Sequence, residues 1–159
     1  MGKQVKCRER VSKHGEIFTN EREGYAMLDL VKQEAERIDS RVLEPACGEG
    51  AFLKEILKRK LKTVKEKYAA DPREYRRNSI LALKSIYGID IMEDNIQICR
   101  QALYDIWNDA FTEYAKEQAD EKSREEARSI LSKNIVAGDA LTMLQNDGLP
   151  ITFTDWNPA

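Results

Sequence analysis

Two closely spaced glycines follow an acidic residue in the stretch 44–52, which reads EPACGEGAF. Glycine tolerates left-handed backbone and lets a ligand approach the main chain, so such a loop can cradle a cofactor. The third glycine of the dinucleotide fingerprint G-x-G-x-x-G is absent, and an acid stands where a pyrophosphate would meet the next helix. A carboxylate there repels phosphate and favours a cationic group, such as an ammonium or a sulfonium.

Two further acids, Asp90 and Asp139, each follow a short apolar run that is typical of a buried strand. A carboxylate at Asp90 can accept both hydroxyl protons of an unphosphorylated ribose. Asp139 can accept from an exocyclic amine while the backbone N–H of Ala140 meets a ring nitrogen, which describes adenine recognition. Ribose, adenine and a cationic tail together make S-adenosylmethionine.

Helices and strands alternate along the chain and are expected to position these residues. Apolar residues recur at helical spacing from Tyr25 to Ile38, from Phe52 to Val64 and from Ile96 to Tyr114, and Asp71-Pro72 begins another helix that carries Ile80, Leu81 and Leu83 inward. Strands are expected at 41–45, 86–91 and 134–138, and the charged stretch 117–128 is expected to form a solvated helix-turn region. The pattern predicts the α/β class, with a Rossmann-like, doubly wound, mostly parallel sheet truncated after about three strands and preceded by a helix. Such sheets bind ligands at the carboxyl ends of their strands, where all three acids fall.

In this order, the three stretches resemble the first three cofactor motifs of DNA amino-methyltransferases from restriction-modification systems. The stretch 44–52 is similar to the family pattern D/E-P-A-C-G-x-G-x-F. The stretch 13–19 resembles the segment found before the first motif in those family members whose cofactor-binding motifs precede the catalytic motif along the chain. The resemblance covers nearly the whole chain. It implies S-adenosylmethionine as the cofactor and DNA as a partner of the full-length enzyme, and it favours adenine N6 as the methylated amine.

The resemblance and the residue chemistry together predict a set of cofactor-binding residues. In the family the segment before the first motif closes over the methionine part of the cofactor, which suggests Phe18 and Thr19 as contacts. The complete predicted set is Phe18, Thr19, Glu44, Ala46, Gly48, Gly50, Phe52, Asp90, Ile91, Asp139 and Ala140.

The chain departs from the family at the catalytic step. An exocyclic base amine is a poor nucleophile, and the family activates it with an N/D-P-P-Y/F/W tetrad that accepts its protons and stacks on the flipped base. Asn157-Pro158 lacks the preceding buried apolar strand, so the catalytic motif is expected beyond Ala159 and no catalytic residue is assigned within the chain. Long insertions between Gly50 and Asp90 and between Asp90 and Asp139 also separate the motifs. Cofactor binding is expected, and methyl transfer by these residues alone is not.

The composition of the chain limits the partners, the metal or disulfide sites and the cellular location that we expect. The 26 basic and 28 acidic side chains give a net charge of −2, which does not by itself indicate a nucleic-acid partner. Cys7, Cys47 and Cys99 lie far apart without a C-x-x-C pair, so neither a zinc site nor a disulfide framework is expected. The absence of a bilayer-spanning apolar run and of a secretory signal predicts a cytoplasmic protein without a membrane partner. Residues 1–13 are interpreted as a flexible basic arm, and residues 14–159 as the cofactor-binding part of one domain.

Several alternatives stay open at this stage. The glycine loop could be an ordinary strand-to-helix turn, and either Asp90 or Asp139 could be a solvent-facing loop acid. The basic stretch 54–84 and the acidic stretch 93–126 are expected to pair with each other rather than bind phosphate. The same cofactor half also serves protein or RNA methyltransferases. A non-catalytic cofactor-binding or assembly module is the remaining alternative. The uncovered edge of the first strand, where a fourth strand should pair, predicts that the chain forms a dimer or a larger species.

Overall fold

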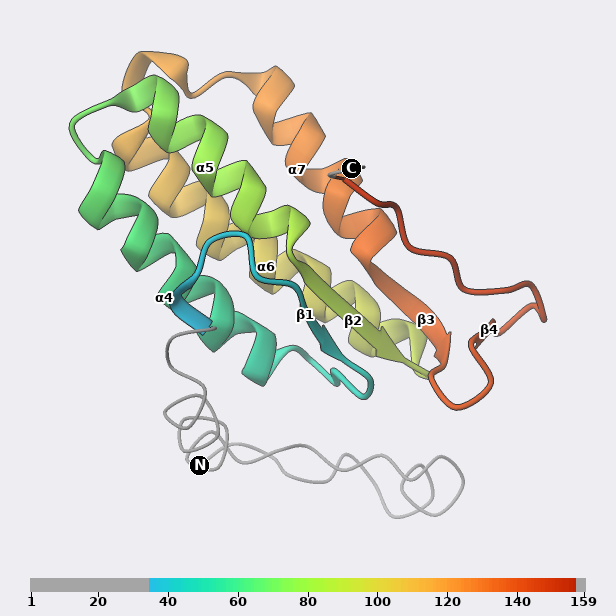
Figure 1. The fold of residues 1–159 in the computed structure, drawn as a ribbon. Coiled ribbons are helices and arrows are strands. Elements are labelled where there is room, and N and C mark those ends of the chain that lie inside the picture. Colours follow the sequence, from blue (N-terminus) through green and yellow to red (C-terminus); the bar gives the residue numbers. More distant parts are fainter. Residues whose placement is uncertain (1–34, 157–159) are drawn as a thin grey trace.

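Three short apolar segments pair side by side as parallel strands in the computed structural model, which describes residues 35–156 (Figure 1). Strand β1 (Val42–Glu44) pairs with β2 (Ile86–Asp90), which pairs with β3 (Ile135–Asp139). A two-residue strand, β4 (Leu144–Gln145), returns antiparallel to β3 and completes the order β1-β2-β3-β4. The predicted α/β class and mostly parallel sheet are confirmed.

Four helices connect the strands: α4 (Ala51–Tyr68), α5 (Pro72–Lys84), α6 (Glu93–Tyr114) and α7 (Glu121–Asn134), with a short 3-10 helix, η1 (Lys116–Gln118), before α7. Asp71 caps α5 as predicted, because its carboxylate accepts from the backbone N–H of Glu74 at 3.2 Å. The charged stretch 117–128 is less solvated than predicted, since α7 buries Ala127 and Ser123 within it. The helix expected at 25–38 lies mostly outside the described residues.

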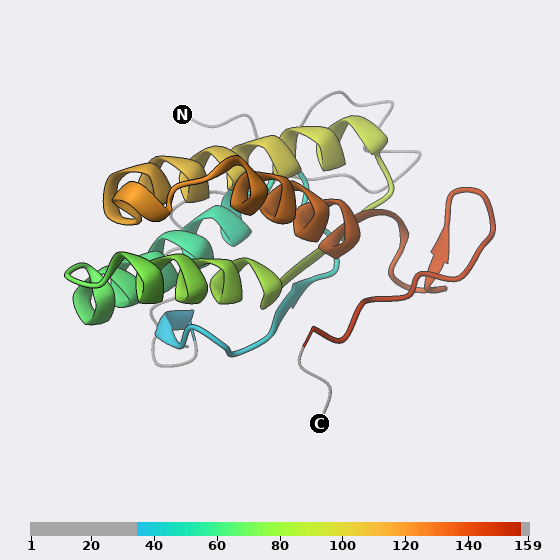
Figure 2. The same ribbon diagram turned by 90° about the horizontal axis from the view of Figure 1, so that it is seen from above.

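All four helices lie on one face of the sheet (Figure 2). Crossovers between parallel strands are almost always right-handed, so two crossovers that advance in the same direction place their helices on the same side. The paths β1-α4-α5-β2 and β2-α6-α7-β3 are two such crossovers. A doubly wound sheet needs helices on its second face as well, and that finer arrangement remains a prediction.

The helix-covered face holds the main core. Trp107 is fully buried on α6 and stacks on Phe111 with ring centroids 4.4 Å apart, while its indole N–H donates to Ser79 on α5 at 3.2 Å. The aromatic residues of α6 are therefore core residues, as their helical spacing predicts. Leu81, predicted to point inward, is only partly buried, and the neighbouring Ala82 and Leu83 are buried in full.

One lysine is buried completely on this face, against the expectation from its charge. The ammonium of Lys60 on α4 donates to the backbone carbonyls of Ser40, at 2.8 Å, and of Arg37 and Ile38. A buried ammonium is costly unless it is hydrogen-bonded, and these backbone carbonyls supply acceptors for it. Lys60 thereby ties the turn before β1 to the middle of α4.

The basic and acidic helices pair as expected. Arg76 on α5 lies 3.8 Å from Asp120, and Lys84, at the end of α5, lies 3.7 Å from Glu126 on α7. Both ion pairs are partly exposed, so they contribute little to the free energy of unfolding. They nevertheless show that the two charge-rich stretches face each other in the fold.

An extended segment, residues 150–156, crosses the second face of the sheet, and we call it the strap. Phe153 meets Tyr87 of β2 edge to face, with centroids 5.1 Å apart, and Ile151 is buried. Asp155 pairs with Arg41 at 2.8 Å, and the indole N–H of Trp156 donates to Asn134 at 2.9 Å. The strap thus runs from the hairpin formed by β3 and β4 back toward the amino ends of the parallel strands (Figure 1).

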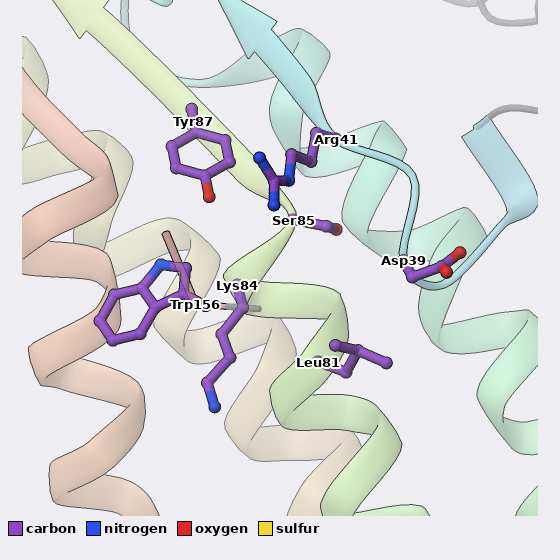
Figure 3. Close-up of a pocket in the computed structure, with 7 residues that line it drawn as sticks. All are labelled: Asp39, Arg41, Leu81, Lys84, Ser85, Tyr87 and Trp156. Carbon is purple, nitrogen blue, oxygen red and sulfur yellow. The ribbon is translucent and has the colours of Figure 1, made fainter. Parts of the chain in front are cut away.

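The strap covers this face incompletely. A groove of about 310 Å³ remains between it and the edge of the sheet, lined by Val42, Leu43, Tyr87 and Phe153 together with Arg41, Thr154 and Asp155. A smaller pocket at the amino ends of β1 and β2 lies beside Lys84 and Trp156 (Figure 3), whose ammonium and indole are 5.7 Å apart. Within residues 35–156, no helix is long and apolar enough to cross a membrane.

Candidate functional site

Each of the three parallel strands ends on an acidic residue. Glu44 is the last residue of β1, Asp90 of β2 and Asp139 of β3. Because the strands are parallel and adjacent, the three acids lie along the same edge of the sheet, as the sequence predicts. This edge is the place where parallel sheets bind ligands.

The glycine loop takes a conformation that only glycine accepts without strain. Gly48 and Gly50 have φ values of 56° and 94°, in the left-handed region. A Cβ atom on Gly50 would lie 2.7 Å from the Sγ atom of Cys99 on α6. The loop also bonds to the neighbouring strand, because the N–H of Cys47 donates to the carbonyl of Ile89 at 2.9 Å. The two glycines therefore let the chain turn tightly against α6.

Asp90 joins the glycine loop to the end of β2. Its side chain, in a residue only 8% exposed, accepts at Oδ2 from the N–H of Gly48 at 3.0 Å. Its Oδ1 accepts from the N–H of Met92 at 2.8 Å and from Nδ2 of Asn95 at 3.2 Å. A carboxylate oxygen has about two acceptor positions, so among residues 35–156 Oδ1 has both positions filled and Oδ2 has one of its two filled.

Glu44 lies half-buried at the start of the loop. Its Oε1 accepts from the N–H of Ala46 at 3.2 Å, while burial raises the pKa of its carboxyl above the usual value. Burial disfavours the charged form, which an approaching cation would restore. Glu44 is thus placed to favour a cationic ligand group, although Ala46 itself is exposed.

Asp139 makes a local turn after β3. Its Oδ1 accepts from the N–H of Leu141 at 2.8 Å, and its backbone carbonyl accepts from Met143. Ala140 is half-buried beside it. The hairpin that follows reaches the end of β2, because Asn146 donates to the carbonyl of Ile91 at 3.1 Å. The ends of β2 and β3 are therefore linked along the edge that carries Asp90 and Asp139.

Two cysteines that are far apart in sequence meet beneath the loop. Cys47 and Cys99 are both buried free thiols. Contact with the Cys99 thiol, together with burial, raises the pKa of Cys47 far above its usual value. A thiol that does not ionise is a poor nucleophile, so the buried Cys47 is a packing residue beneath the loop.

The structure brings most of the predicted residues to one edge but not all of them. Phe52 instead packs against the core, whereas Ile91 directly follows Asp90 at this edge and is 37% exposed. Phe18 and Thr19 lie outside the described residues. Within residues 35–156, no cluster of three or more histidine, cysteine or acidic residues could hold a metal ion.

The last residues of the sequence are expected to lack the apolar strand that precedes the catalytic motif of the family. Ala159, beyond which that motif is predicted, lies outside the described residues, as do Asn157 and Pro158. The last described residues, 150–156, form the strap and contain no strand. This agrees with the interpretation that no apolar strand precedes Asn157-Pro158, while the place of the catalytic motif beyond Ala159 stays a prediction.

Asn95 is the site residue that sequence reasoning missed. It lies in the first turn of α6, fully buried, with its amide against Asp90. The available signal was its spacing, since it follows the strand-end acid by five residues and directly precedes the buried Ile96. A polar residue on the inward face of a helix has to find a partner.

Comparison with protein-family models, with curated protein sequences and with solved structures finds no match to this chain in any of the three.

Proposed function

We propose that this chain binds S-adenosylmethionine at the carboxyl edge of its sheet and forms the cofactor half of a DNA amino-methyltransferase with adenine N6 as its target. The observation that carries the proposal is that three adjacent parallel strands each end on an acid, with a left-handed glycine loop after the first. This arrangement suits a ligand with hydroxyl and amine donors and a positive charge, and it disfavours a pyrophosphate.

Each acid has a separate role in this proposal. Glu44 and the loop face the cationic methionine part, Asp90 accepts from a ribose hydroxyl, and Asp139 accepts from the adenine amine. Ile91 and Ala140 follow the second and third acids and contact the adenine ring. The methyl group then points away from the sheet toward a base held by the catalytic part of the full-length enzyme. In this proposal a doubly wound Rossmann-like domain is completed by elements that cover the second face and extend the sheet beyond β1.

Isothermal titration calorimetry of the full 159-residue chain with S-adenosylmethionine, S-adenosylhomocysteine and NAD tests the proposal. We expect binding of the first two and none of NAD. Binding of NAD alone, or of none of the three, contradicts it.

Two charge-removing variants test the assigned acids. Asp90→Asn and Asp139→Asn should each weaken binding of S-adenosylmethionine at least about tenfold, since a hydrogen bond to a charged group contributes about 1.5–3 kcal/mol. Asp147→Asn is a matched control, because Asp147 makes the same kind of turn, accepting from the N–H of Leu149 at 3.0 Å, but does not end a parallel strand. Equal affinities for the three variants would remove the support for the proposed site.

An assembly module is the second candidate function, and the exposed edge of β1 favours it. Among the described residues β1 pairs only with β2, and Leu43 in its centre is 47% exposed. An unpaired strand edge can pair with another chain. Sedimentation equilibrium should then show a dimer or a larger species, whereas a monomer at all concentrations excludes self-association through β1.

A further inference from the structure

The amide of Asn95 takes part directly in the candidate site. The residue is fully buried, and its Nδ2 donates to Oδ1 of Asp90 at 3.2 Å across the junction between β2 and α6. A buried amide that lost this acceptor would leave a donor unsatisfied, which is costly. The Asn95–Asp90 contact is therefore held by the packing of α6 as well as by the hydrogen bond itself.

This contact decides which oxygen of Asp90 is left for a ligand. Asn95 and the N–H of Met92 fill Oδ1, while the N–H of Gly48 takes one position on Oδ2. Rotation of the carboxylate about its bond to Cβ would break all three bonds at once. Within the part of the chain that the structure describes, the remaining acceptor position lies on Oδ2, the oxygen that also accepts from Gly48 of the glycine loop.

We propose that Asn95 is a positioning residue that locks the Asp90 carboxylate so that it accepts one ligand hydroxyl, at Oδ2, instead of a hydroxyl pair. The inference rests on the proposed function, because it concerns the ribose of the same cofactor. It goes further by stating that one of the two ribose hydroxyls is recognised at Asp90 and the other is not.

Deoxy analogues of the product test the number of hydroxyls recognised. The wild-type chain is titrated with S-adenosylhomocysteine and with its 2′-deoxy and 3′-deoxy forms. We expect one deoxy analogue to bind at least about tenfold more weakly and the other to bind within about threefold of the parent, because a tenfold change corresponds to the loss of one hydrogen bond. Equal losses for both analogues, or no loss for either, overturn the single-acceptor assignment.

An acidic variant at position 95 tests the positioning role through its pH dependence. Asn95→Asp places a second carboxyl against Asp90, and two carboxylates in contact cannot both stay ionised without cost. Among the described residues, Asp94 on α6 accepts from the backbone N–H of Asn95, and the thiol of Cys47 interacts electrostatically with both Asp90 and Glu44. At pH 8 the variant should bind S-adenosylhomocysteine at least about tenfold more weakly than wild type. The deficit should shrink toward pH 5, where a protonated carboxyl at position 95 can again donate to Asp90.

The matched control is Asn78→Asp on α5. Asn78 also donates its Nδ2 to a carboxylate, that of Glu74 at 3.3 Å, but lies away from the site. This variant introduces the same change in charge and should bind as wild type does at both pH values. Asn95→Ala covers the case in which Asn95→Asp does not fold, and it should bind more weakly at every pH.

The outcomes separate the two proposals. A wild-type chain that binds no adenosyl ligand overturns the proposed function and this inference together. A wild-type chain that binds, with Asn95→Asp unaffected at pH 8 or equally weak at pH 8 and pH 5, overturns the inference alone.

Discussion

The two faces of the sheet are closed in different ways. On one face, four helices bury a continuous core that includes Trp107, Phe111 and the Leu53 side chain. On the other, a single extended segment of seven residues touches the sheet through Ile151 and Phe153 and leaves Leu43 47% exposed. Apolar burial is the main favourable term in folding, so the helical face supplies most of the stability. The strap face is the part of the sheet that remains accessible to another element or another chain.

The largest expected effect comes from the helical face. Phe111→Ala removes a fully buried ring that stacks on Trp107 and lies beneath the guanidinium of Arg124. The free energy of unfolding should fall by about 3–5 kcal/mol, as for other buried phenylalanines that leave a cavity. Urea unfolding followed by circular dichroism measures it. A loss below about 1 kcal/mol would show that the helical face does not carry the stability.

A smaller effect is expected where the glycine loop meets α6. Gly50→Ala combines a φ of 94° with a Cβ atom 2.7 Å from the Sγ of Cys99, and should cost about 1–3 kcal/mol. Gly148→Ala is the matched control, since Gly148 has a φ of 86° with nothing within 4 Å of the added atom. The difference between the two variants in thermal unfolding isolates the contact with Cys99. Equal costs would mean that the loop is free to move away from α6.

The strap face should respond less to the same change of residue. Phe153→Ala removes a half-buried ring in edge-to-face contact with Tyr87 and should cost about 1 kcal/mol. Hydrogen exchange should accelerate at the amide of Ile151, which donates to the carbonyl of Met143 at 2.8 Å, while the amides of β2 keep their protection. A cost equal to that of Phe111→Ala would abolish the proposed contrast between the two faces.

In the described part of the helical face, one buried hydroxyl lacks a hydrogen-bond partner, and removing it should stabilise the protein slightly. The hydroxyl of Tyr75 is buried and has no hydrogen-bond partner among residues 35–156. Tyr75→Phe removes this unsatisfied group and should add about 0.5–1 kcal/mol to the free energy of unfolding at pH 7. A destabilised variant would instead indicate a bond made by that hydroxyl.

The burial of Tyr75 also predicts how the free energy of unfolding depends on pH. Burial raises the pKa of Tyr75 in the folded state above its ordinary value of 10. Above pH 10 the unfolded chain therefore loses this proton before the folded chain does, and stability falls. The advantage of Tyr75→Phe should consequently increase from pH 9 to pH 11 in chemical denaturation, and a constant advantage would argue against the burial of this group.

Local sequence signals predicted the elements that position the site. Asp71 before Pro72 marks the start of α5, and the apolar runs before Asp90 and Asp139 mark β2 and β3. These features depend on residues a few positions apart, so periodicity and capping are sufficient to find them. The three acids lie at one edge of the sheet because the three strands that end on them are parallel.

The features that sequence did not predict depend on distant partners. The burial of Lys60 depends on carbonyls of the turn at 37–40, about twenty positions away, and the role of Asn95 requires the carboxylate of Asp90 to be turned toward it. The strap contacts Arg41, Tyr87 and Asn134, which lie just before β1, in β2 and at the end of α7. Periodicity carries no information about such pairings, so residues 151–156 could be recognised only as lacking an apolar strand.

The chain has two tryptophans, and each lies in a different environment. Trp107 is shielded from water in the core, whereas Trp156 is half-buried with the ammonium groups of Lys84 and Lys133 5.7 Å and 5.4 Å from its ring centre. Indole fluorescence shifts to longer wavelength when water reaches the ring. The intrinsic fluorescence of the wild-type protein should therefore report on the two regions separately. Release of the strap should change the longer-wavelength emission of Trp156, while the shorter-wavelength emission of Trp107 should persist until the helices separate.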